Sequence, residues 1–272
     1  MIVIKNSNLQ RWLTGIVLAA ALLLIILFGP LELVAFIIAL AAGMGTWEYT
    51  NIVFGPGFLK EKIESLVFAI LIPCVALFGD AQALIALLSS AVIVVFIIFL
   101  WRVNETTFDI SRVAKVIFGL VYIPLLTSHF IFLRKLDNGV YWILIVLVIG
   151  IVGDTVAMYV GKSLGRRKLI ALVSPGKTVE GTIGLILGAT LAACLFGYFL
   201  MPGISLVHFV VLGFVGSIIG QLGDLCESAI KRNYGRKDAG ALLPGHGGLM
   251  DRLDSLIFLA PFVFYYRIFV IG

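Results

Sequence analysis

The charged residues of this chain gather in one short stretch. Residues 224–254 read DLCESAIKRNYGRKDAGALLPGHGGLMDRLD and hold ten of the 35 Asp, Glu, Lys and Arg residues. Acidic residues stand at both ends, basic residues lie between them, and a glycine-rich turn with a histidine precedes the second acidic group. Carboxylates bind hard divalent cations, and Lys and Arg neutralise phosphate charge. The stretch therefore indicates chemistry on a phosphorylated substrate.

The first half of this stretch has helical spacing. Asp224, Glu227, Ser228 and Lys231 stand at i, i+3, i+4 and i+7, so they share one face of a helix. On the functional interpretation, Asp224 binds a metal ion and Lys231 binds a phosphate. The alternative is an ordinary solvated ladder of salt bridges.

The second half combines a turn with two carboxylates. Glycines surround His246, which either binds a phosphate or donates a proton, or simply lies in a tight surface turn. Asp251 and Asp254 are three residues apart at the head of an apolar run, where the helix dipole alone favours acidic residues. Asp224 ends one apolar run and Asp251 begins the next. A loop between two consecutive spans starts and ends on the same side of the membrane, so we expect both carboxylates at the same membrane face.

Two further segments carry candidate site residues. The segment SPGKTVEGT covers residues 174–182, where Lys177 stands beside the start of a predicted helix and favours an anion site. Ser174 and Thr178 have a simpler alternative role as caps of that helix. Asp154 lies inside an apolar run, where a carboxylate faces either a polar cavity or a neighbouring helix.

Composition predicts an all-α, polytopic membrane helix bundle. Apolar residues make up 61% of the chain and charged residues 13%, and several uncharged runs are long enough to cross about 30 Å of hydrocarbon. We expect about nine transmembrane helices, the first of them a retained helix and not a cleaved signal. They lie near residues 12–28, 31–47, 64–79, 83–101, 115–133, 140–160, 180–200, 205–223 and 253–271.

The basic residues predict the orientation of these spans. Seventeen of the 20 Lys and Arg residues fall at the N-terminus or in loops after even-numbered spans, which places the N-terminus in the cytoplasm. The net charge is +5, but the basic residues lie where membrane topology requires them. The charge therefore does not indicate nucleic-acid binding. We expect two regions, residues 1–135 with five spans and residues 136–272 with four spans and two cytoplasmic loops.

At the charged residues the chain resembles the phosphatidate cytidylyltransferases, also called CDP-diacylglycerol synthases. The family pattern runs S-x-x-K-R-x4-K-D, a small residue, P-G-H-G-G, then D-R-x-D, and the segments GDTVAMYVGK and SPGKTVEG also match the family. The resemblance covers about residues 140–260. The pattern is met here at Ser228, Lys231, Arg232, Lys237, Asp238, residues 244–248, Asp251, Arg252 and Asp254.

The resemblance implies a magnesium-dependent enzyme of the inner (cytoplasmic) membrane whose active site faces the cytoplasm. It would transfer a cytidylyl group from CTP to phosphatidate, giving CDP-diacylglycerol and pyrophosphate for phospholipid biosynthesis. Asp224 and Asp251 match the family's metal ligands, and a second cation and a homodimer stay open. With Lys231 as a further catalytic residue, the expected substrate-binding residues are Ser174, Lys177, Thr178, Arg232, Lys237, Asp238 and His246. Asp154, Glu227 and Asp254 are weaker candidates for contacts near the metal or the nucleotide.

Two alternative functions use similar residues. A CTP-dependent lipid kinase needs the same carboxylates and bases but transfers the γ-phosphoryl group, so it releases CDP and not pyrophosphate. A transporter would carry ionisable residues across the middle of the bilayer, whereas here they gather at one face. The lipid substrate would enter sideways from the inner leaflet while CTP arrives from the cytoplasm.

Overall fold

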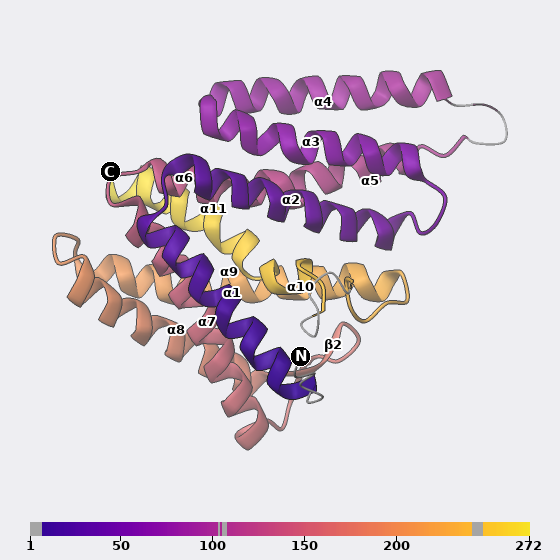
Figure 1. The fold of residues 1–272 in the computed structure, drawn as a ribbon. Helices are drawn as coiled ribbons and strands as arrows, with labels where there is room; N and C mark the ends of the chain where they lie inside the picture. The colour runs from indigo at the N-terminus through magenta and orange to yellow at the C-terminus, as the bar shows by residue number, and fades with distance from the viewer. Residues whose placement is uncertain (1–6, 103, 105–107, 241–246) are drawn as a thin grey trace, which may run out of the picture. The chain divides into compact units, whose positions relative to one another are not determined.

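The computed structural model describes residues 7–102, 104, 108–240 and 247–272, and these form helices and one short β-hairpin (Figure 1). The chain divides into two compact units. One comprises Met1–Phe132 with Asp238–Asp251, and the other comprises Leu133–Lys237 with Arg252–Gly272. The predicted division at residue 135 stays a prediction.

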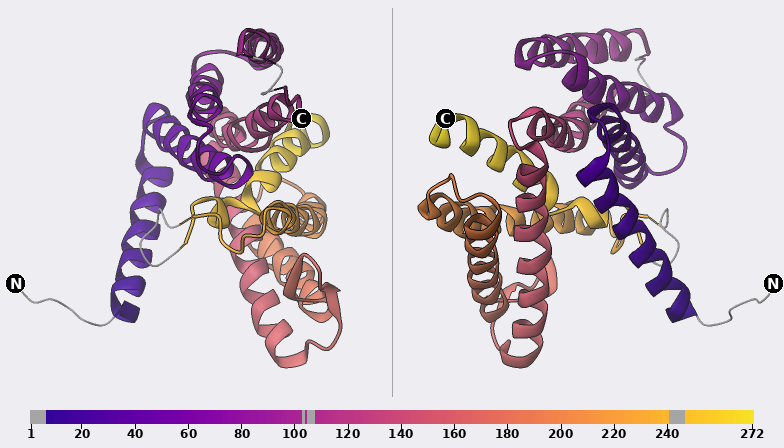
Figure 2. Two further views of the ribbon diagram at one scale, coloured as in Figure 1. Left: turned by 90° about the vertical axis from the view of Figure 1, so that its right-hand side faces the viewer. Right: turned by 60° about the vertical axis from the view of Figure 1, so that its left-hand side comes forward.

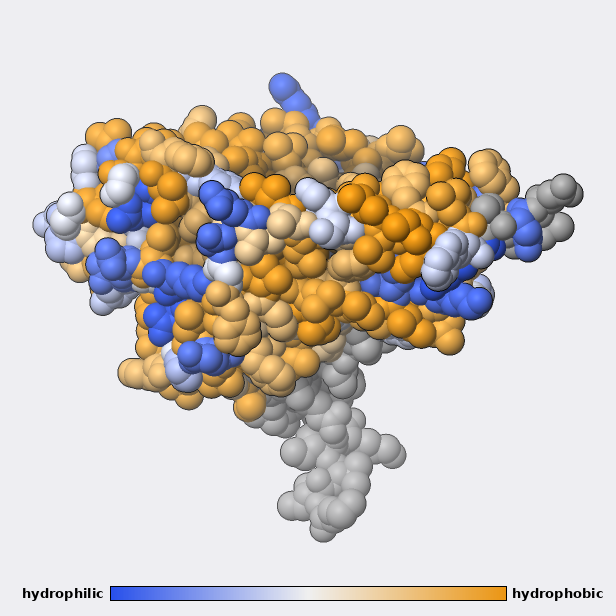
Figure 3. Space-filling model, turned by 90° about the horizontal axis from the view of Figure 1, so that it is seen from above, coloured by the Kyte–Doolittle hydropathy of each residue, from blue (hydrophilic) through white to orange (hydrophobic). Residues whose placement is uncertain are grey.

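The helical membrane fold predicted from composition is confirmed. Within the described residues, seven helical segments are long and apolar enough to cross a membrane. Large apolar side chains such as Ile93, Leu187 and Phe214 are exposed, and apolar residues dominate the surface in Figure 3. Such a surface suits contact with lipid. The seven segments are Leu31–Val53, Ala81–Arg102, Ser111–Lys135, Gly139–Leu164, Val179–Leu200, Leu206–Asn233 and Met250–Ile271.

The other two predicted spans also coincide with helices. The first corresponds to α1 (Ser7–Phe28) and the third to α3 (Leu59–Phe78). Four charged residues crowd the first turns of α3. They are Lys60, Glu61, Lys62 and Glu64. The count of nine and the orientation of the N-terminus stay predictions.

The first unit is built on α2 (Leu31–Val53), which packs along α3. Helix α4 (Ala81–Arg102) and helix α5 (Ser111–Leu120) also contact α3. Small side chains permit close approach, and Ala35 of α2 and Ala76 of α3 are buried together with Ile131.

A π-helical segment interrupts the predicted span 115–133. Helix α5 is followed by η1 (Val121–Leu125) and then by α6 (Leu126–Lys135). Pro124 lies inside η1 and has no backbone N–H to donate. The hydroxyls of Thr127 and Ser128 donate to the carbonyls of Ile123 and Pro124 at 2.7 and 2.6 Å, so backbone acceptors here have local partners.

The second unit is built on α7 (Gly139–Leu164), α8 (Val179–Leu200) and α9 (Leu206–Asn233). Helices α7 and α8 run side by side in the views of Figure 2. Glycines allow this contact: a Cβ at Gly184 would lie 2.8 Å from Val160, and one at Gly188 would lie 2.7 Å from Val156. Valine side chains of α7 therefore pack directly against the backbone of α8.

The loop between α7 and α8 contains a β-hairpin that the sequence analysis did not predict. Strand β1 (Lys168–Ile170) pairs antiparallel with β2 (Ser174–Thr178), with Lys168 opposite Thr178 and Ile170 opposite Ser174. The amide of Val179 donates to the carbonyl of Arg167 at 2.9 Å and closes the base of the hairpin. The hairpin thus delivers residues 174–178 directly to the start of α8.

The last predicted span is broken near its start. Helix α10 (Met250–Leu253) is followed by a turn at Asp254 and Ser255, then by α11 (Leu256–Tyr266) and a π-helical end, η2 (Arg267–Ile271). The Asp254 carboxylate accepts a hydrogen bond from the Ser255 amide at 2.7 Å. Asp251 therefore lies in α10, and Asp254 lies in the turn between α10 and α11.

The contact between α9 and α8 yields a stability prediction. A Cβ at Gly213 would lie 2.5 Å from the Thr190 Cα and 3.0 Å from the Ala189 carbonyl oxygen, and backbone atoms cannot move aside easily. Gly213→Ala should cost about 1–3 kcal/mol of stability, measured by thermal unfolding in detergent. Gly203→Ala is the matched control, since a Cβ there meets nothing within 4 Å. Equal melting temperatures for the two variants would contradict the close contact.

Candidate active site

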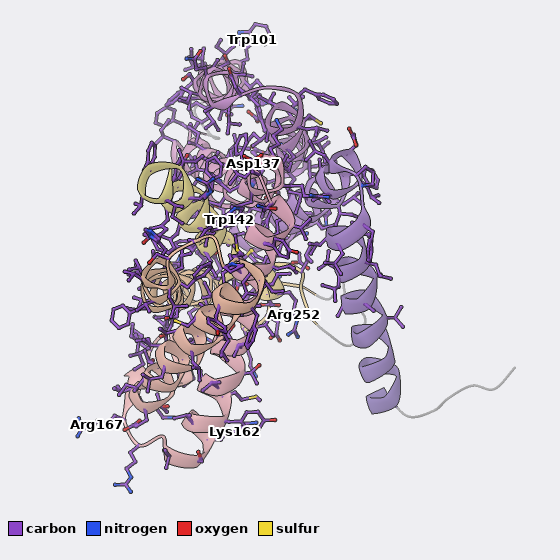
Figure 4. The ribbon with its side chains drawn as sticks, turned by 90° about the vertical axis from the view of Figure 1, so that its left-hand side faces the viewer. Trp101, Asp137, Trp142, Lys162, Arg167 and Arg252 are labelled. Atoms are coloured by element: carbon purple, nitrogen blue, oxygen red, sulfur yellow. The ribbon has the colours of Figure 1, made fainter. Side chains whose placement is uncertain are left out.

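A polar cavity of about 350 Å³ opens in the second unit between α7, β2, α8 and α9. Its charged lining residues are Asp154 and Lys162 from α7, Lys177 from β2 and Asp224 from α9. Figure 4 shows Lys162 and Arg167 at one end of α7 and Asp137 at the other. Four of the sequence candidates, Asp154, Lys177, Thr178 and Asp224, line this one cavity.

The start of α8 forms one wall of the cavity, and Thr178 caps it. The Thr178 Oγ1 accepts a hydrogen bond from the Gly181 amide at 3.1 Å, as the capping alternative predicted. A Cβ at Gly161 or Gly181 would come within 3.1 Å of this hydroxyl oxygen, so glycines on α7 and α8 make room for the cap. The Thr178 hydroxyl therefore has a structural role, and its role in substrate binding stays a prediction.

Glu180, in the first turn of α8, links this helix start to the end of α7. Its carboxylate accepts hydrogen bonds from the amides of Arg166 and Arg167 at 3.0 and 3.2 Å. These amides follow the end of α7, so Glu180 ties the end of one helix to the beginning of the next.

Lys177 and Asp224 form an ion pair across the cavity. The Lys177 Nζ lies 2.5 Å from the Asp224 Oδ2, and both side chains are about one-fifth exposed. Asp154 and Asp254 both interact electrostatically with this pair, attracted by Lys177 and repelled by Asp224. One ammonium group thus interacts with three carboxylates, and their summed charge is negative when all are ionised.

The predicted polar face of α9 is confirmed. The Ser228 hydroxyl donates to the Asp224 Oδ1 at 3.4 Å, and the Lys231 Nζ lies 3.2 Å from the Glu227 Oε1. Glu227 is fully buried and Lys231 is 8% exposed. This pair is therefore not a solvated surface ladder, and Lys231 points its charge at a buried carboxylate.

The remaining candidates of this unit lie around the hairpin and the end of α9. Ser174 begins β2 and is half-buried, and Lys237 is exposed. The Arg232 guanidinium donates to the carbonyls of Val173 and Arg236, both at 3.3 Å. Arg232 thus holds the hairpin loop against the end of α9, a structural role that the sequence did not indicate.

Asp251 and Asp238 belong to the first unit. The Asp251 carboxylate accepts hydrogen bonds from the amides of Gly248 and Ala239 at 3.0 and 3.1 Å, and Asp238 is exposed beside Ala239. Gly247 has a φ of +83°, a conformation that favours glycine. His246 lies outside the described residues, and its role stays a prediction.

Two polar residues at these sites were missed in the sequence analysis. Gln221 is 7% exposed, lines the cavity and donates from Nε2 to the Thr182 hydroxyl at 2.8 Å. A single amide three residues before Asp224 in an apolar run was the available signal. Glu48 of α2 is 2% exposed and binds the backbone at residues 249 and 250. An acid directly after the apolar run 31–47 was its signal in the sequence.

Fold and cavity define a multi-pass helical membrane protein with a charged cavity between its helices. The chain belongs to the cytidylyltransferase family, whose family model matches residues 9–270. This confirms the family resemblance and the enzyme class predicted from residues 140–260.

Individual relatives agree with this assignment. The phosphatidate cytidylyltransferase of Bacillus subtilis (strain 168) is 34% identical over 262 residues, which cover 94% of this chain and 96% of the relative. The enzyme of the same name from Staphylococcus haemolyticus (strain JCSC1435) is 31% identical and covers 92% of this chain and 95% of the relative. The uncharacterized protein YnbB of Escherichia coli (strain K12) is 38% identical over 60% of this chain and 56% of its own length.

The buried pair on α9 yields a second prediction. Lys231→Met should destabilise the protein by about 3–5 kcal/mol, because it leaves Glu227 buried without this cation. The double variant Glu227→Gln/Lys231→Met should recover most of that loss. Chemical unfolding in detergent micelles measures both. If Lys231→Met alone unfolds like the parent protein, the ion pair does not stabilise the fold. That result would favour the interpretation in which Lys231 binds a phosphate.

Proposed function

We propose that this protein transfers a cytidylyl group from CTP to phosphatidate and releases pyrophosphate, giving CDP-diacylglycerol for phospholipid biosynthesis. The observation that carries the proposal is the cavity in which Lys177 and Asp224 meet beside the start of α8. It lies within the stretch that matches the family pattern. Relatives that share nearly the full length of the chain are named for this reaction.

The charges of the cavity suit the chemistry of the reaction. The nucleophile is a phosphate oxygen of the lipid, which is already anionic near pH 7, so no strong general base is required. Catalysis then consists of positioning the two substrates and neutralising their charge. Lys177 and Lys162 supply positive charge in the cavity wall, and the start of α8 adds the positive end of a helix dipole.

We propose Asp224 and Asp251 as ligands of Mg²⁺. Across the described residues, no group of three His, Cys, Asp or Glu side chains forms a metal site alone. Mg²⁺ is commonly bound through one or two carboxylates together with water and substrate phosphates, so this fits. The surplus of carboxylates around Lys177 also favours a divalent cation. When bound, Mg²⁺ would neutralise phosphate charge and stabilise the pyrophosphate leaving group.

The lipid would reach the cavity from the bilayer. Met158, which is 45% exposed, and Leu185 form part of the cavity lining beside the charged residues. Acyl chains could stay in hydrocarbon while the phosphate enters the charged region. We propose an inner-membrane location with the cavity open to the cytoplasm, as the distribution of basic residues predicts.

Asparagine substitutions test the metal ligands and the reaction together. In purified protein supplied with CTP, phosphatidate and Mg²⁺, Asp224→Asn and Asp251→Asn should each lower turnover about 100-fold or more, because each removes charge stabilisation. Asp109→Asn, which alters an exposed loop carboxylate, should keep full turnover. Product analysis should find CDP-diacylglycerol and pyrophosphate in equal amounts.

Two outcomes would contradict the proposal in different ways. Near-normal turnover of either Asn variant at limiting Mg²⁺ would remove that residue from the metal site. Release of CDP with a newly phosphorylated lipid would replace the cytidylyltransferase by the kinase alternative.

A further inference from the structure

Glu48 of α2 is a buried carboxylate with partners distant in the sequence. It is 2% exposed, and its Oε1 and Oε2 accept hydrogen bonds from the amides of Leu249 and Met250 at 3.1 and 2.8 Å. A carboxylate is costly to bury unless hydrogen bonds satisfy it. More than 200 residues separate the partners in the chain, so only the folded protein creates this contact.

The backbone on both sides of the turn is shaped to fit this carboxylate. A Cβ at Gly240 would lie 2.6 Å from the Glu48 Oε1, and one at Gly248 would lie 2.9 Å from its Oε2. Neither glycine has a positive φ. They are therefore required for space, because any side chain would displace the carboxylate.

The same segment orients Asp251. The amide of Gly248 donates to the Asp251 carboxylate at 3.0 Å, and the next two amides donate to Glu48. Two carboxylates from distant parts of the chain thus bind three consecutive amides. Releasing Glu48 would free the amides that follow Gly248 and loosen the backbone that holds Asp251.

We propose that Glu48 is a positioning residue of the active site: it fixes the backbone of residues 248–250 and thereby the carboxylate of Asp251. The inference rests on the proposed function, in which Asp251 is a magnesium ligand. On this proposal Glu48 acts through the backbone and not by direct contact with substrate. Its two oxygens suit two N–H donors, whereas a Gln side chain offers one oxygen and places an N–H₂ group against the second donor.

Hydrogen exchange in the full-length protein tests the contact directly. In Glu48→Gln, the amides of Leu249 and Met250 should exchange about ten-fold faster or more, since each loses or weakens a charged hydrogen bond. Tyr49→Phe is the matched control, because Tyr49 is also 2% exposed on α2 but donates to the carbonyl of Lys115. Unchanged exchange at 249 and 250 in Glu48→Gln would overturn the proposal.

Kinetics test whether the contact serves the site. Glu48→Gln should lower kcat about ten-fold with a smaller change in the KM for CTP, and it should raise the Mg²⁺ concentration needed for half-maximal turnover. Tyr49→Phe should change none of these. Added to Asp251→Asn, Glu48→Gln should cause little further loss. Faster exchange with normal kcat and Mg²⁺ dependence would show a merely structural contact and overturn the positioning role.

A second variant approaches the same contact from the turn. Gly240→Ala would push a methyl group against the Glu48 carboxylate and should reproduce the exchange and kinetic changes, even if Glu48→Gln fails to fold. Failure of the proposed function looks different. Asp251→Asn would then keep full turnover while Glu48→Gln still accelerates exchange at 249 and 250.

Discussion

Most of this structure follows from one constraint: a polar group surrounded by hydrocarbon must find its partner within the protein. Many of these partners lie within one helical turn. Hydroxyls of Thr127 and Ser128 serve the carbonyls around Pro124, and Lys231 serves the buried Glu227 one helical turn away. Where local partners are insufficient, polar groups make tertiary contacts, and the binding of backbone amides by Glu48 is a long-range example.

The same constraint accounts for the cavity. Close contact between α7 and α8, made possible by glycines, leaves little space along most of their length. The polar cavity lies where α8 begins, and the first amides of a helix lack partners inside the helix. Thr178 satisfies one of them, and Lys177 and Asp224 pair beside it. The site that we propose for anionic substrates thus lies where the secondary structure already requires polar groups.

The sequence predicted features that depend on local periodicity and composition. Uncharged runs located the helices, and the spacing from Asp224 to Lys231 correctly predicted one polar face on α9. Features set by tertiary contacts were not predictable in this way. The hairpin at Lys168 has no clear alternation of polar and apolar residues, and Glu48 stands one residue beyond the predicted span 31–47. Only folding reveals that its carboxylate meets Met250.

The bond from Glu48 to the amides of residues 249 and 250 also bears on how far this enzyme can be divided. The family pattern lies entirely in the second half of the chain, so the early helices look like a replaceable membrane anchor. Yet α2 supplies the buried partner of the segment that carries Asp251. A fragment starting after residue 135, or a chimera with foreign N-terminal helices, would keep every residue of the pattern and lack this support.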